Sequence, residues 1–114
     1  NTVSVATGQK HIDVDSNRKG DLAEYYAVTW LWDQGYEVFK NAGCTGPIDL
    51  IAYNLETEET ILIDVKTFLK DPRDGTYSKT PKQRSQLQKD QNVVRLGFNP
   101  ITRKLRFIGH RETK

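Results

Sequence analysis

The sequence predicts an α/β protein with a mixed central sheet flanked by helices, in the element order αβββαββ. A long segment with apolar residues at helical spacing is followed by three short segments rich in β-branched, aliphatic and aromatic residues. A second helical segment then precedes two more segments of the short type. The 114 residues are enough for a single hydrophobic core. We therefore expect one domain over residues 17–114, preceded by an arm over residues 1–16 with a short strand at 11–14.

The first helix is expected to run from Ser16 or Asn17, either of which can cap it, to about Gln34. Gly35 then ends it. We expect its aromatic side chains to pack in the core rather than to stack on bases. The apolar residues at helical spacing are Leu22, Ala23, Tyr26, Ala27, Trp30 and Leu31.

Three strands are expected next, at residues 36–42, 48–53 and 60–67. Segments 43–47 and 54–59 separate them and contain the glycine, proline and polar residues that are typical of turns.

The second half of the chain begins with a polar stretch, residues 69–80, which predicts a loop. Pro81 suits the first turn of a second helix that runs to about Gln91. Residues 92–98 and 104–108 are expected to form the last two strands.

The composition, 36% hydrophobic and 28% charged, is that of an ordinary globular protein. No apolar run approaches the length of a membrane span, so we expect no membrane partner. The single Cys44 cannot form an internal disulfide, which is typical of the reducing cytoplasm. His11 and His110 lie near the chain ends, where we expect surface residues.

The net charge of +2 is distributed unevenly along the chain. Residues 1–65 carry four basic and eleven acidic side chains, a net charge of −7. Residues 66–114 carry thirteen basic and four acidic side chains, a net charge of +9. A strongly basic half favours a polyanionic partner such as DNA, although a solvated charged face explains the charge equally well.

Two aspartates are expected to meet on neighbouring strands. A four-residue turn at residues 55–58 would pair residues whose numbers add to 113, which places Asp49 directly opposite Asp64. Two carboxylates so placed repel each other, and a divalent cation that takes an oxygen from each relieves the repulsion. A turn that differed by one residue would put the aspartates on opposite faces.

Further residues can complete a metal site around this pair. Lys66 shares the strand face of Asp64 and could orient a water or stabilise developing charge. Glu24 borders the apolar side of the first helix and could supply a third carboxylate. Val65 is also a candidate metal-binding position. Oxygen ligands favour Mg²⁺ or Mn²⁺ over zinc.

With these residues in place, the sequence resembles the PD-(D/E)XK nuclease superfamily, which has a restriction-endonuclease-like αβββαβ core. The resemblance covers residues 18–67. Its motifs are Arg18-Lys19-Gly20 with Glu24, Gly46-Pro47-Ile48-Asp49-Leu50-Ile51-Ala52, and Ile63-Asp64-Val65-Lys66. One departure is that Ile48 separates the proline from the aspartate.

The resemblance implies metal ligation by Glu24, Asp49 and Asp64 and activation of water by Lys66. The expected activity is divalent-metal-dependent hydrolysis of DNA phosphodiester bonds. The Gly20 to Glu24 motif is similar to that of Holliday-junction resolvases, which favours branched DNA, and sequence-specific homing or restriction-type cleavage is the alternative. A homodimer is expected because small nuclease domains pair to cut two strands.

The remaining candidates are DNA contacts. The family often has a glutamine on the helix after the third strand, and Gln83, Gln86 and Gln88 are available, of which Gln83 has the best spacing. The predicted DNA-binding residues are Arg18, Lys19, Lys79, Lys82, Gln83, Arg84 and Lys89.

Two alternatives stay open at the level of sequence. Asp49, Asp64 and Lys66 could form a structural ion pair with a turn-capping aspartate. The chain could also be a non-catalytic nucleic-acid-binding module, although such a module gains nothing from acidic groups placed near phosphate.

Overall fold

A computed structural model describes residues 16–43 and 45–109. The predicted arm and its strand, Cys44, His11 and His110 lie outside these described residues. The elements are α1 (Ser16–Asp33), β1 (Tyr36–Lys40), β2 (Leu50–Asn54), β3 (Thr60–Thr67), β4 (Leu69–Lys70), β5 (Tyr77–Lys79), α2 (Gln86–Asp90), β6 (Val94–Phe98) and β7 (Leu105–Phe107).

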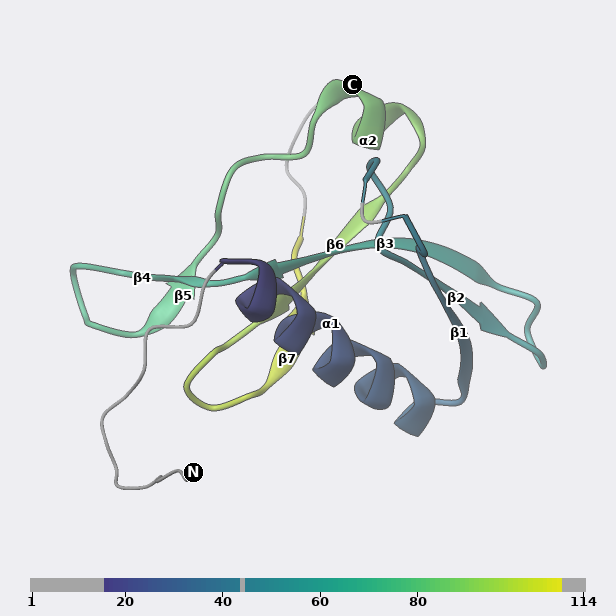
Figure 1. Ribbon diagram of the computed structural model, residues 1–114, viewed down its shortest axis with the longest axis horizontal. Helices are drawn as coiled ribbons and strands as arrows, with labels where there is room; N and C mark the ends of the chain where they lie inside the picture. The colour runs from purple at the N-terminus through teal and green to yellow at the C-terminus, as the bar shows by residue number, and fades with distance from the viewer. Residues whose placement is uncertain (1–15, 44, 110–114) are drawn as a thin grey trace, which may run out of the picture.

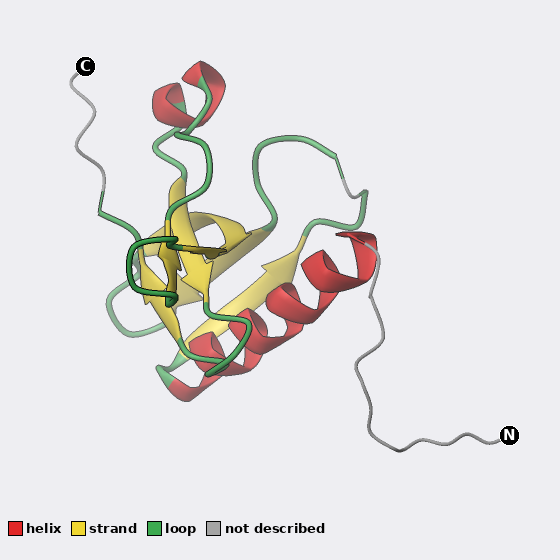
Figure 2. Ribbon diagram, turned by 90° about the vertical axis from the view of Figure 1, so that its left-hand side faces the viewer, coloured by secondary structure: helices red, strands yellow, loops and turns green. Residues whose placement is uncertain are grey.

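The main sheet has five strands in the order β1-β2-β3-β6-β7, and it is mixed as predicted. β3 and β6 are parallel, whereas the other neighbours are antiparallel. Helix α1 lies along one face of this sheet, and α2 stands apart from it (Figures 1 and 2). The predicted αβββαβ core with a mixed sheet is therefore confirmed.

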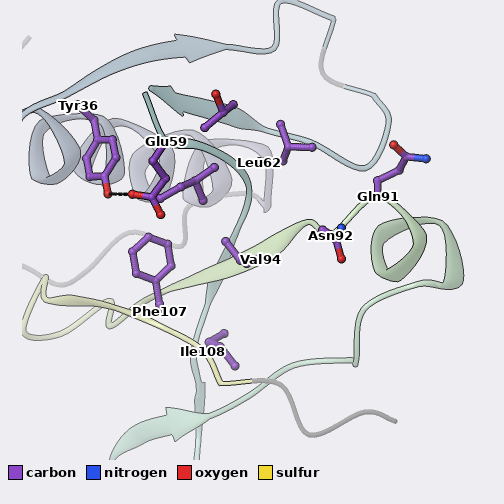
Figure 3. A pocket seen from close by; sticks show the side chains of 10 residues that line it. Tyr36, Glu59, Leu62, Gln91, Asn92, Val94, Phe107 and Ile108 are labelled. Atoms are coloured by element: carbon purple, nitrogen blue, oxygen red, sulfur yellow. Dashed lines mark hydrogen bonds between the residues drawn. The ribbon is translucent and has the colours of Figure 1, made fainter. Parts of the chain in front are cut away.

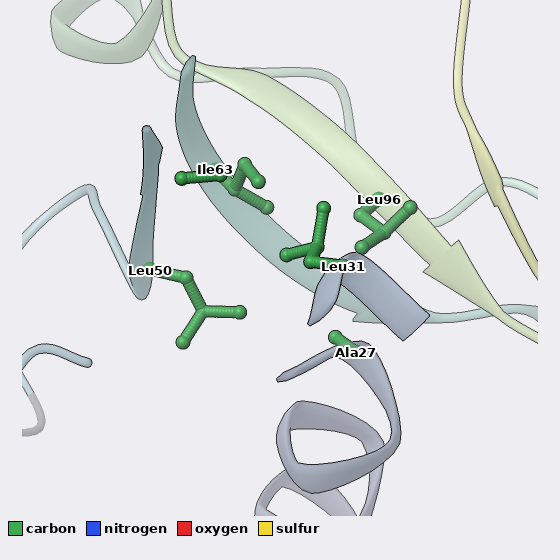
Figure 4. Close-up of a cluster of buried hydrophobic side chains, with 6 residues drawn as sticks. Ala27, Leu31, Leu50, Ile63 and Leu96 are labelled. Atoms are coloured by element: carbon green, nitrogen blue, oxygen red, sulfur yellow. The ribbon is translucent and has the colours of Figure 1, made fainter. Parts of the chain in front are cut away.

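The core lies between α1 and the covered face of the sheet (Figure 4). Ala27 and Leu31 of α1 are fully buried against Leu50, Ile63 and Leu96, one residue from each of the three central strands. Each large side chain so buried contributes about 1.5–3 kcal/mol to the stability of the fold. This packing fixes which side of each strand faces away from the helix.

The aromatic residues of α1 were expected in the core, but three of the four are exposed, of which Tyr26, at 36%, still packs against the ring of Phe98. Tyr25 is 62% exposed and Trp32 is 59% exposed. Small residues are buried instead, because Ala23 and Ala27 let the helix approach the sheet closely. Among the described residues, no helix is long and apolar enough to span a membrane.

The second helix is shorter than expected. It begins after Ser85, not at Pro81, because the side chain of Ser85 accepts a hydrogen bond from the backbone N–H of Gln88. The side-chain oxygen of Gln88 in turn accepts a hydrogen bond from the backbone N–H of Ser85, and this reciprocal pair forms a capping box.

The predicted loop at residues 69–80 contains a small hairpin, β4–β5, which extends beyond the end of β3 (Figure 1). Its turn is closed by Gly75, whose φ of 76° is readily adopted only without a side chain. The first two strands of the main sheet also differ slightly from the prediction, since β1 ends at Lys40 and β2 begins at Leu50.

Candidate active site

The predicted register between β2 and β3 is confirmed. Leu50 pairs with Ile63 and Tyr53 pairs with Thr60, which is the expected alignment. Asp49 lies one residue before β2, and its backbone N–H donates at 2.8 Å to the carbonyl of Ile63, the partner of Leu50, so the ladder becomes irregular at Asp49. The Asp49 carboxylate nevertheless lies beside Asp64, because it accepts a hydrogen bond from the backbone N–H of Val65 and its pKa is affected by the Asp64 carboxylate.

The two aspartates lie on the sheet face that α1 does not cover. Leu50 and Ile63 point toward α1, and successive side chains of a strand alternate between the faces. Asp64 and Lys66 consequently share the opposite face, and the Asp49 carboxylate joins them there through its contacts with Val65 N and Asp64. The alternation that buries the core thus places the acidic groups together on the other side.

The contacts within this group are short. The backbone N–H of Val65 donates to Asp49 Oδ2 at 2.8 Å, and Lys66 Nζ lies 3.5 Å from Asp64 Oδ2. The Asp64 side chain is 8% exposed and that of Lys66 is 41% exposed, so the ammonium group reaches solvent. Asp64 Oδ2 is buried and has no hydrogen-bond partner among the described residues.

The environment of Asp49 disfavours its charged form. Burial raises the pKa of Asp49 to about 6, against the lowering effect of its hydrogen bond from Val65. A side-chain hydrogen bond with Asp64 and the negative charge of Asp64 raise the pKa further, and the charge of Lys66 lowers it. Two acids are therefore held close enough for one to retain its proton.

This arrangement fits a divalent cation. Asp64 Oδ2 is buried and forms no hydrogen bond within the described residues, and the Lys66 ammonium group at 3.5 Å compensates its charge only in part, so a cation that binds it would be favourable. Carboxylate oxygens are the donors that Mg²⁺ and Mn²⁺ prefer. The described residues contain no group of three or more His, Cys, Asp or Glu side chains arranged to hold a metal, so the pair is the carboxylate set that the fold brings together.

Glu24 does not lie with the pair. Its Oε1 accepts a hydrogen bond from Lys40 Nζ at 2.8 Å. Lys40 pairs with Leu50 and shares its face, so it points to the side of the sheet that α1 covers. The sheet thus separates the Glu24–Lys40 ion pair from the face of Asp49 and Asp64.

The segment before Asp49 is held by two amide side chains. Asn41 Nδ2 donates to the carbonyls of Thr45 and Ile48, each at 2.8 Å. Gln88 Nε2 donates to the carbonyl of Pro47 at 3.1 Å and so connects α2 to the chain two residues before Asp49.

The sequence predicted Gln83 as the glutamine near the site, but Gln88 is the glutamine that contacts the segment before Asp49. Gln83 is exposed and precedes α2, so its predicted place on the helix is wrong. The pattern Ser85-x-x-Gln88 is a capping-box signature and could have located both the start of α2 and this glutamine.

The predicted DNA contacts occupy three regions. Arg18 and Lys19 are exposed in the first turn of α1, Lys79 is exposed on β5, and Lys82 is exposed before α2. Lys89 is half-buried on α2.

Arg84 differs from these, because its Nη1 donates to the Val93 carbonyl at 3.0 Å. This contact holds the start of β6 and gives Arg84 a structural role. The carbonyl of Lys82 likewise accepts a hydrogen bond from the buried Arg95.

A groove in the described part of the chain lies away from these residues. It has a volume of about 720 Å³ and opens between β3, β6 and β7, where Leu62, Phe107 and Ile108 line it (Figure 3). Tyr36 and Glu59 close one side through a hydrogen bond of 3.1 Å. Neither Asp49 nor Asp64 is among the residues that line it.

Comparison with solved structures identifies the fold as one found in a nuclease. The chain superposes on the bacterial homing endonuclease I-Ssp6803I with a TM-score of 0.66 at 16% sequence identity, over 83% of this chain and 69% of that chain. No family model matches the sequence, and no curated protein matches it. At this identity the likeness shows a shared fold.

Proposed function

We propose that this protein is a divalent-metal-dependent DNA endonuclease of the PD-(D/E)XK superfamily. The observation that carries the proposal is the meeting of Asp49, Asp64 and Lys66 on the sheet face that α1 does not cover, where a buried oxygen of Asp64 forms no hydrogen bond and faces the Lys66 ammonium group at 3.5 Å. The nuclease-like fold supports the same assignment.

The proposed metal ligands are the carboxylates of Asp49 and Asp64 and the backbone carbonyl of Val65. A bound Mg²⁺ or Mn²⁺ supplies positive charge that stabilises the negative charge developing on the phosphate and promotes ionisation of water. Glu24, the third ligand that the resemblance implies, is paired with Lys40 on the α1 side of the sheet, so it would have to break this ion pair and move to the other side to bind the same cation.

Lys66 is the proposed proton-handling residue. Its ammonium group is close enough to Asp64 to be oriented by it and exposed enough to reach substrate. In this position Lys66 can orient an attacking water in line with the scissile bond, or stabilise charge on the phosphate oxygens.

The DNA specificity has two candidates. The Gly20 to Glu24 motif favours branched DNA, as for a Holliday-junction resolvase. The fold of a homing endonuclease favours sequence-specific cleavage of duplex DNA instead. In both cases we propose a homodimer, because two active sites related by a twofold axis cut two strands.

The test is a cleavage assay with the variant Asp64→Asn. The wild-type protein with Mg²⁺ should cut at least one of linear duplex, single-stranded, flapped and four-way-junction DNA, and EDTA should stop it. Asp64→Asn should abolish cleavage while DNA binding stays equal or becomes tighter, because the variant removes a charge that binds metal and repels phosphate.

The matched control is Asp71→Asn. Asp71 is also a buried aspartate, but it pairs with Arg73 in the β4–β5 hairpin. Cleavage should survive this control. Wild-type protein that binds DNA without cutting any of the four substrates would instead identify a non-catalytic binding module.

A further inference from the structure

We infer that Arg106 binds a DNA backbone phosphate beside the carboxylate pair and so positions the scissile strand. This inference rests on the proposed endonuclease function and adds a substrate contact to it.

Lys66, Gly97 and Arg106 form one row across the sheet. Gly97 pairs with Lys66 in the parallel ladder of β3 and β6, and it pairs with Arg106 in the antiparallel ladder of β6 and β7. Residues paired in this way project from the same face. Arg106 therefore points to the face that carries Asp49, Asp64 and Lys66.

The ring of Phe68 fills the space above Gly97. A Cβ atom added to Gly97 would lie 2.1 Å from Phe68 Cζ, so no side chain fits there. Phe68 is only 3% exposed, although it directly follows the end of β3. Gly97 thus makes room for an aromatic ring between Lys66 and Arg106.

The guanidinium group of Arg106 lies over this ring, with its carbon 4.5 Å from the ring centroid. Stacking on an aromatic face restrains the guanidinium plane and leaves its N–H edge available to an anion. Arg106 forms no ion pair within the described part of the chain, and residues 91–109 contain no acidic side chain.

These features suit a phosphate diester. A restrained arginine donates two parallel N–H bonds to phosphate oxygens with little loss of side-chain entropy. Lys66 lies in the same row as Arg106, and a polynucleotide backbone can contact both cationic side chains along its length. Arg106 is thus a positioning residue that acts on the strand beside the reacting phosphate.

The experiment compares Arg106→Gln with Arg103→Gln. Arg103 is also exposed and also stacks on an aromatic ring, at 5.2 Å from Tyr26, but that ring belongs to α1. DNA affinity is measured in Ca²⁺ over a range of salt concentrations, and single-turnover cleavage is measured in Mg²⁺.

Arg106→Gln should weaken DNA binding about tenfold, as expected for loss of a charged hydrogen bond. The slope of log K against log salt should become less steep by about 1. Phe68→Leu, which keeps a buried apolar side chain but removes the aromatic face, should weaken binding in the same direction. Arg106→Lys should restore the salt slope, because the charge returns.

The outcomes separate this inference from the proposed function. If the wild type cuts DNA and Arg106→Gln matches Arg103→Gln in affinity, slope and rate, the role of Arg106 is refuted and the endonuclease stands. If the wild type neither binds nor cuts DNA, both are refuted. If melting temperature falls in Arg106→Gln while the salt slope is unchanged, the stacked arginine is structural only.

Discussion

Asp49 is the residue whose ionisation is most strongly coupled to folding. Its pKa is raised from 3.8 to about 6, first by burial and then by Asp64. The folded protein therefore keeps a proton that the unfolded chain releases near pH 4. Without metal, the free energy of unfolding should fall as pH rises from about 4 to about 6 and should then stay reduced, since the unfolded state binds fewer protons in that range.

Asp49→Asn should remove this pH dependence. Asparagine keeps an oxygen that can accept the bond from Val65, but it carries no charge. In EDTA above pH 6 the variant should be more stable than the wild type, by on the order of 2 kcal/mol. Urea unfolding of both proteins between pH 4.5 and 7.5 measures this. A wild type that gains stability relative to the variant as pH rises would contradict the prediction.

Substitution of Lys66 distinguishes a catalytic role of this residue from a structural one. Lys66→Ala should leave Mg²⁺ affinity unchanged or slightly increased, because it removes a positive charge beside two carboxylates. The single-turnover rate should nevertheless fall by about 100-fold or more, the usual contribution of a positioned proton-transfer group.

Lys70→Ala is the matched control at saturating DNA, since Lys70 is an exposed lysine on β4 that can affect DNA affinity but has no contact to the aspartates. If Lys66 is mainly the structural partner of Asp64, its loss leaves a buried charge unpaired. The variant would then show a lowered melting temperature with a near-normal rate.

The element that positions Asp49 from outside the sheet is α2. Gln88 uses both ends of its amide, since Oε1 accepts from Ser85 N and Nε2 donates to the Pro47 carbonyl. Gln88→Met should therefore release the segment before Asp49 and also weaken the cap of α2. We expect the free energy of unfolding to fall by about 1 kcal/mol. We expect a several-fold loss of cleavage rate at limiting Mg²⁺.

Ser85→Ala separates the two effects. It removes the hydroxyl that accepts from the N–H of Gln88 but leaves the contact with Pro47. At a similar loss of melting temperature, cleavage should be affected less by Ser85→Ala than by Gln88→Met. Equal losses of rate would show that α2 acts through its stability alone.

The sequence predicted correctly those elements whose geometry is set by hydrogen bonds between residues close together in the chain. The register of β2 and β3 was predictable because Asn54 closes a four-residue turn, with its side chain accepting from Glu56 N and Thr57 N. Its backbone pairs with Glu59, which sets the alignment for Asp49 and Asp64. A local turn thus determined the geometry of the candidate site.

The elements that were missed depend on distant contacts. The β4–β5 strands are two and three residues long, too short for a periodic pattern, and Asn99 from the turn after β6 donates to the Tyr77 carbonyl. The pairing of Glu24 with Lys40 likewise joins α1 to β1, which the spacing within one helix cannot show.

The acidic and basic halves of the chain supply strands on opposite sides of the main sheet. The acidic residues 1–65 supply β1 and β2 on one side of β3, and the basic residues 66–114 supply β6 and β7 on the other. Asp64 and Lys66 lie on β3 at the boundary. DNA is therefore expected to cross the β6–β7 side and the β4–β5 hairpin, and to avoid β1 and β2.

Neutralising Lys79 and Lys82 together tests this path. Both are exposed, one on β5 and the other before α2, and the double change to glutamine should reduce the salt slope of log K by about 2. The control changes Glu56 and Glu58 to glutamine in the turn between β2 and β3, which alters net charge by two units in the opposite direction. Direct phosphate contact predicts an unchanged slope for this control, because the turn lies in the acidic half. An unchanged slope in the lysine variant would mean that DNA follows another path.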